Sequence, residues 1–378
     1  MRFPEFRGEW QKERLKDKCS FFSGGTPSST NKAYYDGDIP FIRSGEIALD
    51  STELFLSESG LNNSSAKIVE KGDLLLALYG ATSGQIAISQ IKGAINQAIL
   101  CIRSPYDKFF LKSAWEKRVD KILQAYLQGG QGNLSAEIVK NLSFYFPSSQ
   151  EQSKIGQLIL LIDERITTQI RIINEMQSLI SGITQRISKH SSVRMVLLSE
   201  LLVERNEKNT ELFPVHSVSV SEGVINQIDY LGRSFSAADT SHYNVAHRGD
   251  IIYTKSPTGE FPFGIVKRNA IESNVAVSPL YGVYKPISDD VAIYLHYYFC
   301  SPLNAQNYLH KLIQKGAKNT INITNQRFVQ NCIPLPDKKT LTGFVKLISA
   351  VSAKLELEKS LLETLQTQKR YLLTQMFV

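Results

Sequence analysis

The sequence predicts an α/β protein in which two globular units are each followed by a long helix. Three observations support this fold class. Short apolar runs bounded by turn residues alternate with helical patterns, as is typical of α/β units. Motifs recur along the chain at a nearly constant offset, which indicates an internal repeat. Each repeat ends in a heptad pattern, and 378 residues are enough for two domains of ordinary size.

The internal repeat is clearest in three pairs of segments. The run KGDLL at 71–75 returns as RGDII at 248–252, with the two aspartates offset by 250 − 73 = 177. The run GNLSAEIVKNLSFYFP at 132–147 resembles INITNQRFVQNCIPLP at 321–336, with the terminal prolines offset by 336 − 147 = 189. The helical pattern that follows each of these runs keeps this second offset. Loop insertions between the first two matches account for the change in offset.

The heptad patterns predict two long helices that pack on each other. Apolar residues alternate at intervals of three and four over 155–187 and 344–376, and a polar residue interrupts both patterns at the same position, Gln169 and Glu358. A duplicated chain packs most simply with approximate two-fold symmetry, so we expect an antiparallel coiled coil that acts as a spacer. Alternatively, each helix packs only on the core of its own domain. The residues expected in the seam are Ile159, Ile162, Ile166, Ile173, Met176, Ile180, Ile348, Val351, Leu355, Leu362, Leu365 and Leu372.

These patterns divide the chain into four parts. We expect two globular domains and two spacer helices, in the order domain, helix, domain, helix, at 1–150, 151–190, 191–338 and 339–378. In the first domain, strand-like runs and one helix are expected at 39–42, 73–79, 85–91, 99–103 and 109–127. In the second domain, strand-like runs and one helix are expected at 215–220, 250–255, 263–267, 280–285 and 292–314.

The composition is that of a soluble globular protein, with 42% hydrophobic and 21% charged residues. The 43 Lys and Arg exceed the 36 Asp and Glu, giving a net charge of +7. Such an excess fits a polyanionic partner, although many proteins without a nucleic-acid role carry as much. The N-terminal segment lacks the apolar core of a signal peptide, and no run approaches the ~18 apolar residues of a membrane helix. Together with four scattered cysteines, these features predict a cytoplasmic protein with no membrane partner.

The sequence shows no convincing catalytic or metal-binding motif. It has no GxxxxGK[ST] loop, no dinucleotide fingerprint and no Asn-Pro-Pro-aromatic tetrapeptide of amino-methyltransferases. The neighbouring carboxylates Asp36 and Asp38 are typical of turns. The pair His242 and His247 is interpreted as surface residues or base contacts before metal ligands. We therefore expect that the chain alone is not an enzyme and binds neither a cofactor nor a metal.

Loops rich in glycine and hydroxyl residues follow the strand-like runs in both halves. The segment SGGTPSSTNKAYYDGDIPFIRSGEI at 23–47 leads to Arg43 and Ser44, and Tyr79 leads into ATSGQ at 81–85. Short side chains allow the backbone to approach a phosphate, whereas Arg, Lys, Asn and Gln can form paired hydrogen bonds with base edges. These loops are therefore interpreted as a DNA-facing surface. The alternative is that they are solvated loops with no partner.

The order of these motifs resembles the specificity (S) subunit of type I restriction–modification systems. The resemblance rests on Trp10, Leu15 and a series of runs: SGGTPS at 23–28, DGDIPFIRSGEI at 36–47, KGDLLLALYGATSGQIAI at 71–88, NQA at 96–98, QGNLSAEIVKN at 131–141 and EQSKI at 151–155. It extends over essentially the whole chain. The second half departs from the pattern, because it lacks the GGTPS opening and has YTKSP where the first half has YGATS.

The resemblance implies that the two globular units are target-recognition domains for a bipartite site in double-stranded DNA. It implies two modification (M) subunits, which use S-adenosylmethionine to methylate adenine N6, and restriction (R) subunits, which use ATP and Mg²⁺ for translocation and cleavage. Because the loops of the two halves differ, the target should be asymmetric. Alternatives are a specificity subunit of another class of restriction–modification enzyme, a coiled-coil scaffold that binds protein, and a nuclease that acts alone.

Loop position and resemblance together give a set of candidate DNA contacts. In the first half these are Thr26, Ser28, Lys32, Arg43, Ser44, Tyr79, Thr82, Ser83, Gln85, Asn96, Gln97, Gln131 and Asn133. In the second half they are Tyr253, Lys255, Ser256, Thr258, Lys315, Lys318 and Asn322.

Overall fold

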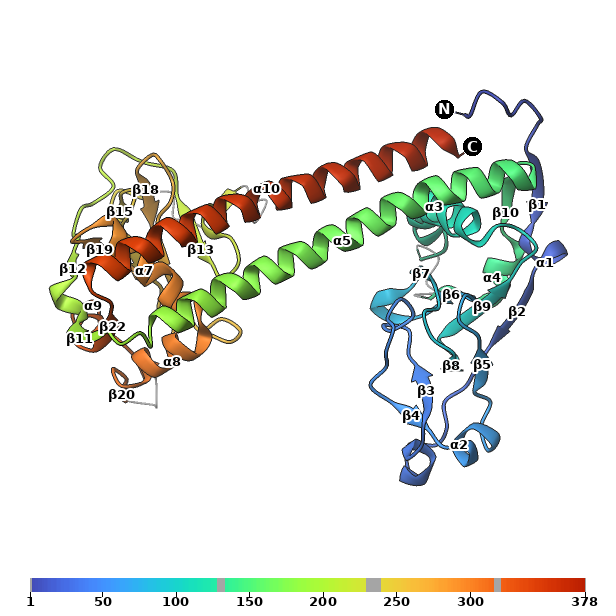
Figure 1. The fold of residues 1–378 in the computed structure, drawn as a ribbon, viewed down its shortest axis with the longest axis horizontal. Helices are drawn as coiled ribbons and strands as arrows, with labels where there is room; N and C mark the ends of the chain where they lie inside the picture. The colour runs from blue at the N-terminus through green and yellow to red at the C-terminus, as the bar shows by residue number, and fades with distance from the viewer. Residues whose placement is uncertain (1, 128–132, 229–238, 316–320, 378) are drawn as a thin grey trace. The chain divides into compact units, whose positions relative to one another are not determined.

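The chain forms two compact units of mixed α/β structure (Figure 1). The computed structural model describes residues 2–127, 133–228, 239–315 and 321–377. The first unit comprises Met1–Ile170 and Ser360–Val378, and the second comprises Arg171–Lys359. Each of the two long helices therefore contributes one half to each unit.

The described residues of the first unit form two four-stranded sheets and one two-stranded ribbon. The sheets have the orders β2-β9-β6-β7 and β4-β3-β8-β5, and β1 pairs with β10. Only the β3–β8 pair is parallel among the strands that the structure describes. The strands are β1 Gln11–Arg14, β2 Ser20–Ser23, β3 Ile39–Ile42, β4 Phe55–Leu56, β5 Lys67–Val69, β6 Leu74–Ala77, β7 Ile86–Ile88, β8 Gly93–Ile95, β9 Ile99–Arg103 and β10 Ser143–Phe146. The helical elements are α1 Leu15–Lys18, η1 Lys32–Tyr35, α2 Glu58–Asn62, η2 Gly80–Thr82, α3 Lys108–Leu127 and α4 Ala136–Asn141.

In the second unit, the residues that the structure describes form one four-stranded sheet of order β12-β19-β16-β17 and four two-stranded ribbons, β11-β22, β13-β14, β15-β18 and β20-β21. The strands are β11 Arg194–Leu197, β12 Leu202–Glu204, β13 His216–Ser219, β14 Gly223–Asn226, β15 Asn244–Ala246, β16 Ile251–Tyr253, β17 Val266–Arg268, β18 Val275–Val277, β19 Gly282–Pro286, β20 Gln314–Lys315, β21 Ile321–Asn322 and β22 Cys332–Leu335. The helical elements are η3 Leu198–Glu200, α7 Asp289–Cys300, α8 Pro302–His310 and α9 Asn325–Phe328.

The main sheets of the two units have the same topology. The order β2-β9-β6-β7 in the first unit corresponds to β12-β19-β16-β17 in the second, and the ribbon β1-β10 corresponds to β11-β22. The central strands β6 and β16 begin at Leu74 and Ile251, which keeps the offset found between the two Gly-Asp runs (251 − 74 = 177). The sequence repeat is therefore a repeat of fold.

An aspartate before each central strand explains why the Gly-Asp pair recurs. Asp73 and Asp250 each accept a hydrogen bond from the backbone N–H three positions earlier, at 2.9 and 2.8 Å. Each also binds an arginine through both carboxylate oxygens, Arg103 for Asp73 and Arg205 for Asp250. The preceding glycines have φ angles of +96° and +89°, which suit glycine. The Gly-Asp motif thus belongs to the scaffold of both units.

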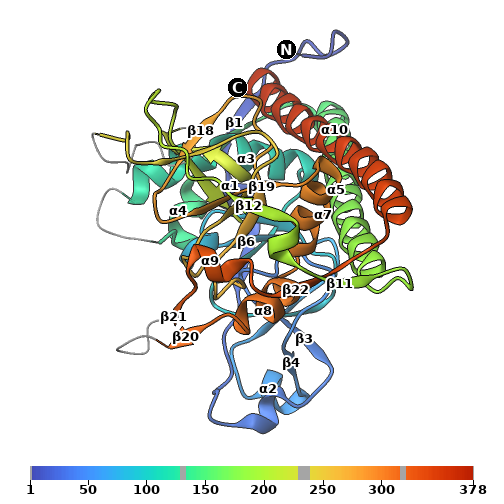
Figure 2. The ribbon, with the colours of Figure 1, turned by 90° about the vertical axis from the view of Figure 1, so that its left-hand side faces the viewer.

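The heptad patterns correspond to two helices of 39 residues each, α5 Ser149–Ile187 and α10 Lys338–Met376. Within each unit the two helices lie side by side (Figures 1 and 2). In the first unit, Ile155 and Ile159 of α5 share a buried cluster with Met376 of α10. In the second unit, Ile180 of α5 packs against the buried cluster that contains Phe344 and Ile348 of α10. The N-terminal half of each helix therefore accompanies the C-terminal half of the other.

All the predicted seam residues are buried or half-buried. In the first unit these are Ile159, Ile162, Ile166, Leu362, Leu365 and Leu372. In the second unit they are Ile173, Met176, Ile180, Ile348, Val351 and Leu355. The polar interruptions are also buried, with Gln169 at 5% and Glu358 at 8% exposure. The apolar face read from the heptads is thus the face that packs.

The helix expected at 292–314 is wrong as a single element. The structure contains two helices there, α7 and α8, separated at Ser301. Pro302 lacks a backbone N–H and its ring clashes with the preceding turn, so α7 cannot continue through it. The Ser301 side chain instead accepts a hydrogen bond from the Asn304 N–H and caps α8.

Replacing Gly249 with Ala should lower the free energy of unfolding by about 1–2 kcal/mol, because residues with a side chain rarely adopt its left-handed conformation. The added Cβ would meet only Asp289 Oδ1, at 3.7 Å, so the cost is conformational. Gly343→Ala is the matched control, since nothing lies within 4 Å of an added Cβ in this helical position. It should raise the free energy of unfolding by ~0.5–1 kcal/mol. Denaturant titrations of both variants measure the difference, and shifts of the same sign would contradict this account.

Candidate nucleic-acid interface

Three loops of the first unit that carry predicted contacts meet beside the end of β6. The Leu78 N–H donates to the Ala98 carbonyl at 2.8 Å, and the Leu134 N–H donates to the Leu78 carbonyl at 3.1 Å. These bonds bring Tyr79 close to the turn at 96–98 and to the segment that precedes α4. The Thr26 hydroxyl donates to Gln97 Oε1 at 2.7 Å, which joins the loop after β2 to the same turn.

The glycine pair after β2 serves close packing. A Cβ on Gly24 would lie 1.7 Å from the Ile95 carbonyl oxygen, and one on Gly25 would lie 2.6 Å from the Ser65 hydroxyl. Neither position can carry a side chain without movement of its neighbours. The hydroxyl residues that follow are exposed, including Thr26 and Ser28. The predicted DNA-facing character of this loop therefore depends on these side chains, because the glycines have a structural role.

Hydrogen bonds hold the loop between β6 and β7 in place, and some of its side chains are exposed. The Ser83 hydroxyl donates to the Leu78 carbonyl at 2.9 Å, and the Trp115 indole N–H of α3 donates to the Gly84 carbonyl at 2.8 Å. Tyr79 is 39% exposed and Gln85 is exposed. A partly exposed phenol can stack on a base, and an exposed amide can bond to its edge. These side chains are the best-placed candidate contacts of this loop.

The other predicted contacts of the first unit lie on turns around this region. Asn96 accepts a hydrogen bond from the Ala98 N–H at 3.1 Å, so its side chain stabilises its own turn. Thr82 and Ser44 are half-buried, whereas Lys32 and Asn133 are exposed. Gln131 lies outside the described residues.

Arg43 is held by carboxylates of its own loop. Its guanidinium donates to Glu46 at 2.9 and 3.1 Å and to Glu53 at 2.5 Å. Glu46 is 8% exposed and also accepts the backbone N–H groups of Arg43 and Glu53. The hydrogen bonds from Arg43 hold the pKa of the Glu46 carboxyl at about 2, well below its usual range. Arg43 therefore organises the loop after β3, a role that was not predicted although the Arg-x-x-Glu spacing could have indicated it.

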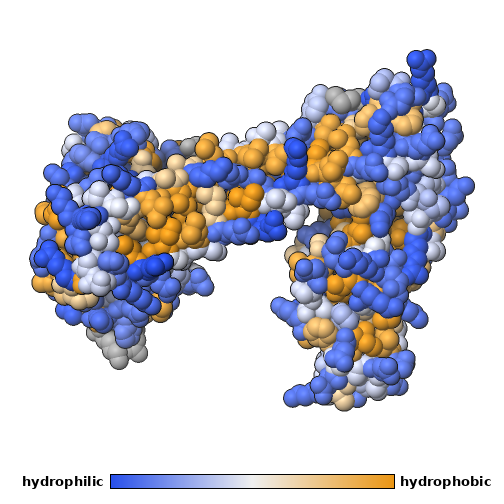
Figure 3. All heavy atoms as spheres, viewed as in Figure 1, coloured by the Kyte–Doolittle hydropathy of each residue, from blue (hydrophilic) through white to orange (hydrophobic). Residues whose placement is uncertain are grey.

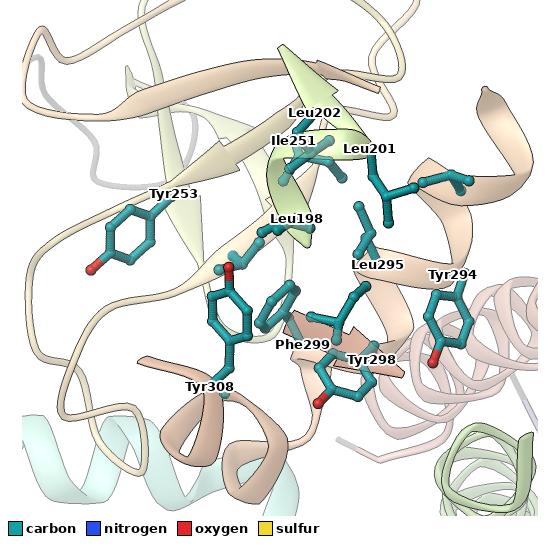
Figure 4. Packing of buried hydrophobic residues seen from close by; sticks show 14 of the residues in the cluster. Leu198, Leu201, Leu202, Ile251, Tyr253, Tyr294, Leu295, Tyr298, Phe299 and Tyr308 are labelled. Atoms are coloured by element: carbon teal, nitrogen blue, oxygen red, sulfur yellow. The ribbon is translucent and has the colours of Figure 1, made fainter. Parts of the chain in front are cut away.

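The prediction that Tyr253 contacts DNA is wrong for this structure. Tyr253 is 1% exposed, stacks on Phe328 with ring centroids 4.5 Å apart, and donates its hydroxyl to the Phe263 carbonyl at 2.8 Å. Figure 4 shows it among the buried residues of the second unit. The strand register explains the error. Tyr253 pairs with Val266 as Leu76 pairs with Ile86, so its counterpart is the buried Leu76 and not Tyr79.

The loop after β16 still exposes polar side chains. Ser256 and Thr258 are exposed, and Lys255 is half-buried. Burial lowers the pKa of the Lys255 ammonium. Lys315 and Asn322 lie on the ribbon β20-β21, which brackets residues 316–320. Lys318 lies outside the described residues.

In the part of the chain that the structure describes, no group of three or more His, Cys, Asp or Glu side chains could hold a metal ion. None of the described helices is both long and apolar enough to cross a membrane.

Glu46→Gln should lower the free energy of unfolding near neutral pH. It should also make the free energy of unfolding less dependent on pH in the acid range. A carboxylate whose pKa is depressed in the folded state stabilises the fold above its ordinary value of 4.5, and this contribution is lost as the pH falls toward about 2. Because Arg43 is partly exposed, we expect a loss on the order of 1–2 kcal/mol at pH 7. Urea titrations at pH 7 and pH 3 measure it. The exposed Glu58→Gln is the control, and equal losses in both variants would contradict the role given to Glu46.

The first part of the chain is similar to a known family of proteins. Residues 7–177 match the model of the type I restriction modification DNA specificity domain. A stretch of 169 residues is 27% identical to the type I restriction enzyme MjaIX specificity subunit of Methanocaldococcus jannaschii and covers 42% of this chain and 39% of that protein. A stretch of 151 residues is 26% identical to the HindI specificity subunit of Haemophilus influenzae and covers 37% of this chain and 32% of that protein. The chain thus matches well under two thirds of the length of these curated relatives.

The fold resembles a solved structure over the whole chain. A type I restriction–modification S subunit from M. genitalium superposes with a TM-score of 0.64 and 13% identity, covering 100% of this chain and 97% of that one. At this identity the likeness concerns the fold alone. The resemblance to specificity subunits that the sequence motifs indicated is confirmed by the matches of the first part of the chain.

Proposed function

We propose that this chain is the DNA specificity subunit of a type I restriction–modification complex. The observation that carries the proposal is the match of residues 7–177 to the specificity-domain family. The second unit repeats the sheet order of the first, which supports a second domain with the same role. On this proposal the chain is a cytoplasmic, non-catalytic subunit that directs the enzymes bound to it.

Each unit is proposed to read one part of a bipartite site in double-stranded DNA. The units share the Gly-Asp turn but differ in the loops that follow the central strands. The loop after β6 is short and has its 3-10 turn at Gly80–Thr82, whereas the segment between β16 and β17 runs from 254 to 265. Different loops on one scaffold present different hydrogen-bonding groups, so the two half-sites should differ in sequence.

The long helices are proposed to form an antiparallel coiled coil that sets the gap between half-sites and docks partner subunits. They carry apolar side chains that packing within the chain leaves exposed, and Figure 3 shows hydrophobic residues on the visible face of these helices. Leu161 is 59% exposed and Leu361 is 46% exposed. Such patches mark protein interfaces. The proposed partners are two M subunits, which use S-adenosylmethionine, and R subunits, which use ATP and Mg²⁺.

Three other functions are distinguishable by simple measurements. A coiled-coil scaffold that binds only protein would show no DNA affinity, whereas DNA contacts through several phosphates weaken steeply with salt. A nuclease acting alone would cut plasmid DNA with Mg²⁺ and no partner. A specificity subunit of another class of restriction–modification enzyme would assemble with a fused catalytic chain in place of separate M subunits.

Co-expression with candidate M subunits, followed by mapping of methylated adenines, tests the proposal. We expect one asymmetric bipartite motif to be methylated, and no methylation when this chain is omitted. A palindromic motif assigned to this chain, or methylation that does not depend on it, would refute the proposed function.

Gln85→Ala should reduce methylation by changing recognition of one half-site only. Its amide is exposed at the end of the anchored β6–β7 loop, so its loss removes hydrogen bonds to DNA without disturbing packing. We expect a loss of about 1–3 kcal/mol in discrimination at a single base position. Gln90→Ala is the control, because Gln90 is exposed but donates to the Ile88 carbonyl. Uniform weakening at unrelated sequences would instead identify Gln85 as a phosphate contact.

A further inference from the structure

Four charged side chains meet where α3, α5 and α10 join in the first unit. Lys112 of α3 lies 2.6 Å from Glu116 and 2.9 Å from Asp163 of α5. Lys369 of α10 lies 2.8 Å from the same Glu116 and 2.7 Å from the same Asp163. The four side chains, called here the ion cluster, are between 18% and 27% exposed. Two ammonium groups thus balance two carboxylates at a largely buried junction.

The opposite charges of the ion cluster compensate one another and outweigh the effect of burial. Burial alone would raise the pKa of the Asp163 carboxyl, but Lys112 and Lys369 outweigh burial and lower it. Burial would likewise lower the pKa of Lys112, but Glu116 and Asp163 raise it. Removing either ammonium would leave two carboxylates with one counter-charge in a site poorly accessible to water. Leaving a buried charge uncompensated is strongly destabilising.

The equivalent junction of the second unit carries no charge among the corresponding residues. The long helices keep the offset of 189 found in the sequence, so Asp163 corresponds to Ser352 (163 + 189 = 352) and Lys369 to Ile180 (369 − 189 = 180). The Tyr297 hydroxyl of α7 and the Ser352 hydroxyl lie 2.5 Å apart. Ile180 packs against the apolar cluster of this unit.

The helix caps show that Tyr297 occupies the position in α7 that Glu116 occupies in α3. Asp107 caps α3 by accepting the Phe110 N–H, and Ser288 caps α7 by accepting the Val291 N–H. Tyr297 and Glu116 each follow the capping residue of their helix by the same number of positions (297 − 288 = 116 − 107). One junction is therefore ionic and the other is neutral at matching positions.

The repeat creates a competing arrangement, because α5 and α10 are similar helices. A second copy of the chain could lay its α5 on the first unit in place of α10. Ile180 of that copy would then replace Lys369, leaving Glu116 and Asp163 with only Lys112. Conversely, α10 of a second copy laid on the second unit would bring an ammonium into an apolar cluster. Both mismatches bury an unpaired charge, which is a recognised means of excluding wrong partners.

We propose that Lys369 selects α10 over a second copy of α5 as the partner of the first unit, so that the long helices pair within one chain. Ile180 makes the complementary choice in the second unit. The ion cluster fits a helix that carries a lysine at this position. It excludes α5 of a second copy, which carries Ile180 there. This inference goes beyond the proposed function, because it holds whether or not the chain reads DNA.

Exchanging the two residues tests the proposal in the full chain. In the double variant Ile180→Lys/Lys369→Ile, pairing within the chain mismatches both junctions, whereas pairing of α5 with α5 and of α10 with α10 between copies satisfies both. We expect the wild type to be monomeric by light scattering and the double variant to be a dimer. Ser181→Arg/Arg370→Ser is the matched control, since both positions are exposed and they correspond to each other in the repeat. The control should remain monomeric.

A monomeric double variant with the wild-type unfolding midpoint would overturn the proposal. If the double variant aggregates, the single variant Lys369→Gln tests the proposal instead. Two differently tagged copies are co-expressed, and the fraction that purifies as mixed pairs is measured. We expect Lys369→Gln to raise this fraction at least ~10-fold, since one unpaired carboxylate is worth more than about 1.4 kcal/mol. Lys369→Arg should restore the wild-type fraction. No rise for Lys369→Gln, or an equal rise for Lys369→Arg, would also overturn the proposal.

Discussion

The structure depends on the way in which each hydrophobic core is completed by both long helices. The core of the first unit includes Ile155 and Ile159 of α5 together with Leu373 and Met376 at the end of α10. The core of the second unit includes Phe344 at the start of α10, and Ile180 of α5 packs against it. Neither core is closed by a contiguous segment of chain. The folding of each unit is therefore coupled to the pairing of two segments that lie far apart in the sequence.

This coupling separates the positions that hold the fold from those that can face a ligand. The seam residues and the Gly-Asp turns recur in both halves because they hold the same arrangement of strands and helices in each half. The loops after β6 and β16 differ in length and sequence, since they do not hold this arrangement. A duplicated scaffold with divergent loops fits the proposed recognition of two different half-sites. The shared packing residues and the divergent loops thus follow from the same separation between positions that hold the fold and positions that can face a ligand.

The sequence predicted the features that have a local period. The heptads identified α5 and α10, and apolar runs identified β3 and β9 with the bounds that the structure has. The short strands β4 and β5 were not predicted, because neither has a readable period and their pairing partners lie far away in the sequence. Helix α7 was extended too far because the apolar pattern continues past the capping residue Ser301.

The candidate site was less predictable than the fold because its chemistry depends on contacts across the sequence. Arg43 had the appearance of a free cation, but Glu53, ten residues away, and Glu46 neutralise it. Tyr253 was matched to Tyr79 by a short motif, whereas the strand register matches it to Leu76. An exposed position and a buried one can share a residue type, and only pairing partners tell them apart.

The anchoring of the loops limits how recognition could change in such a protein. In the first unit, Leu78 bonds through its backbone to both neighbouring loops, and Ser83 and Trp115 hold the β6–β7 loop. These bonds use backbone carbonyls or side chains that point inward, so they do not depend on which residues face outward. Substitution of exposed residues such as Gln85 can therefore alter the groups offered to a ligand while the loop keeps its shape. Substitution of Ser83 or Trp115 would instead remove the side-chain hydrogen bonds that hold the β6–β7 loop.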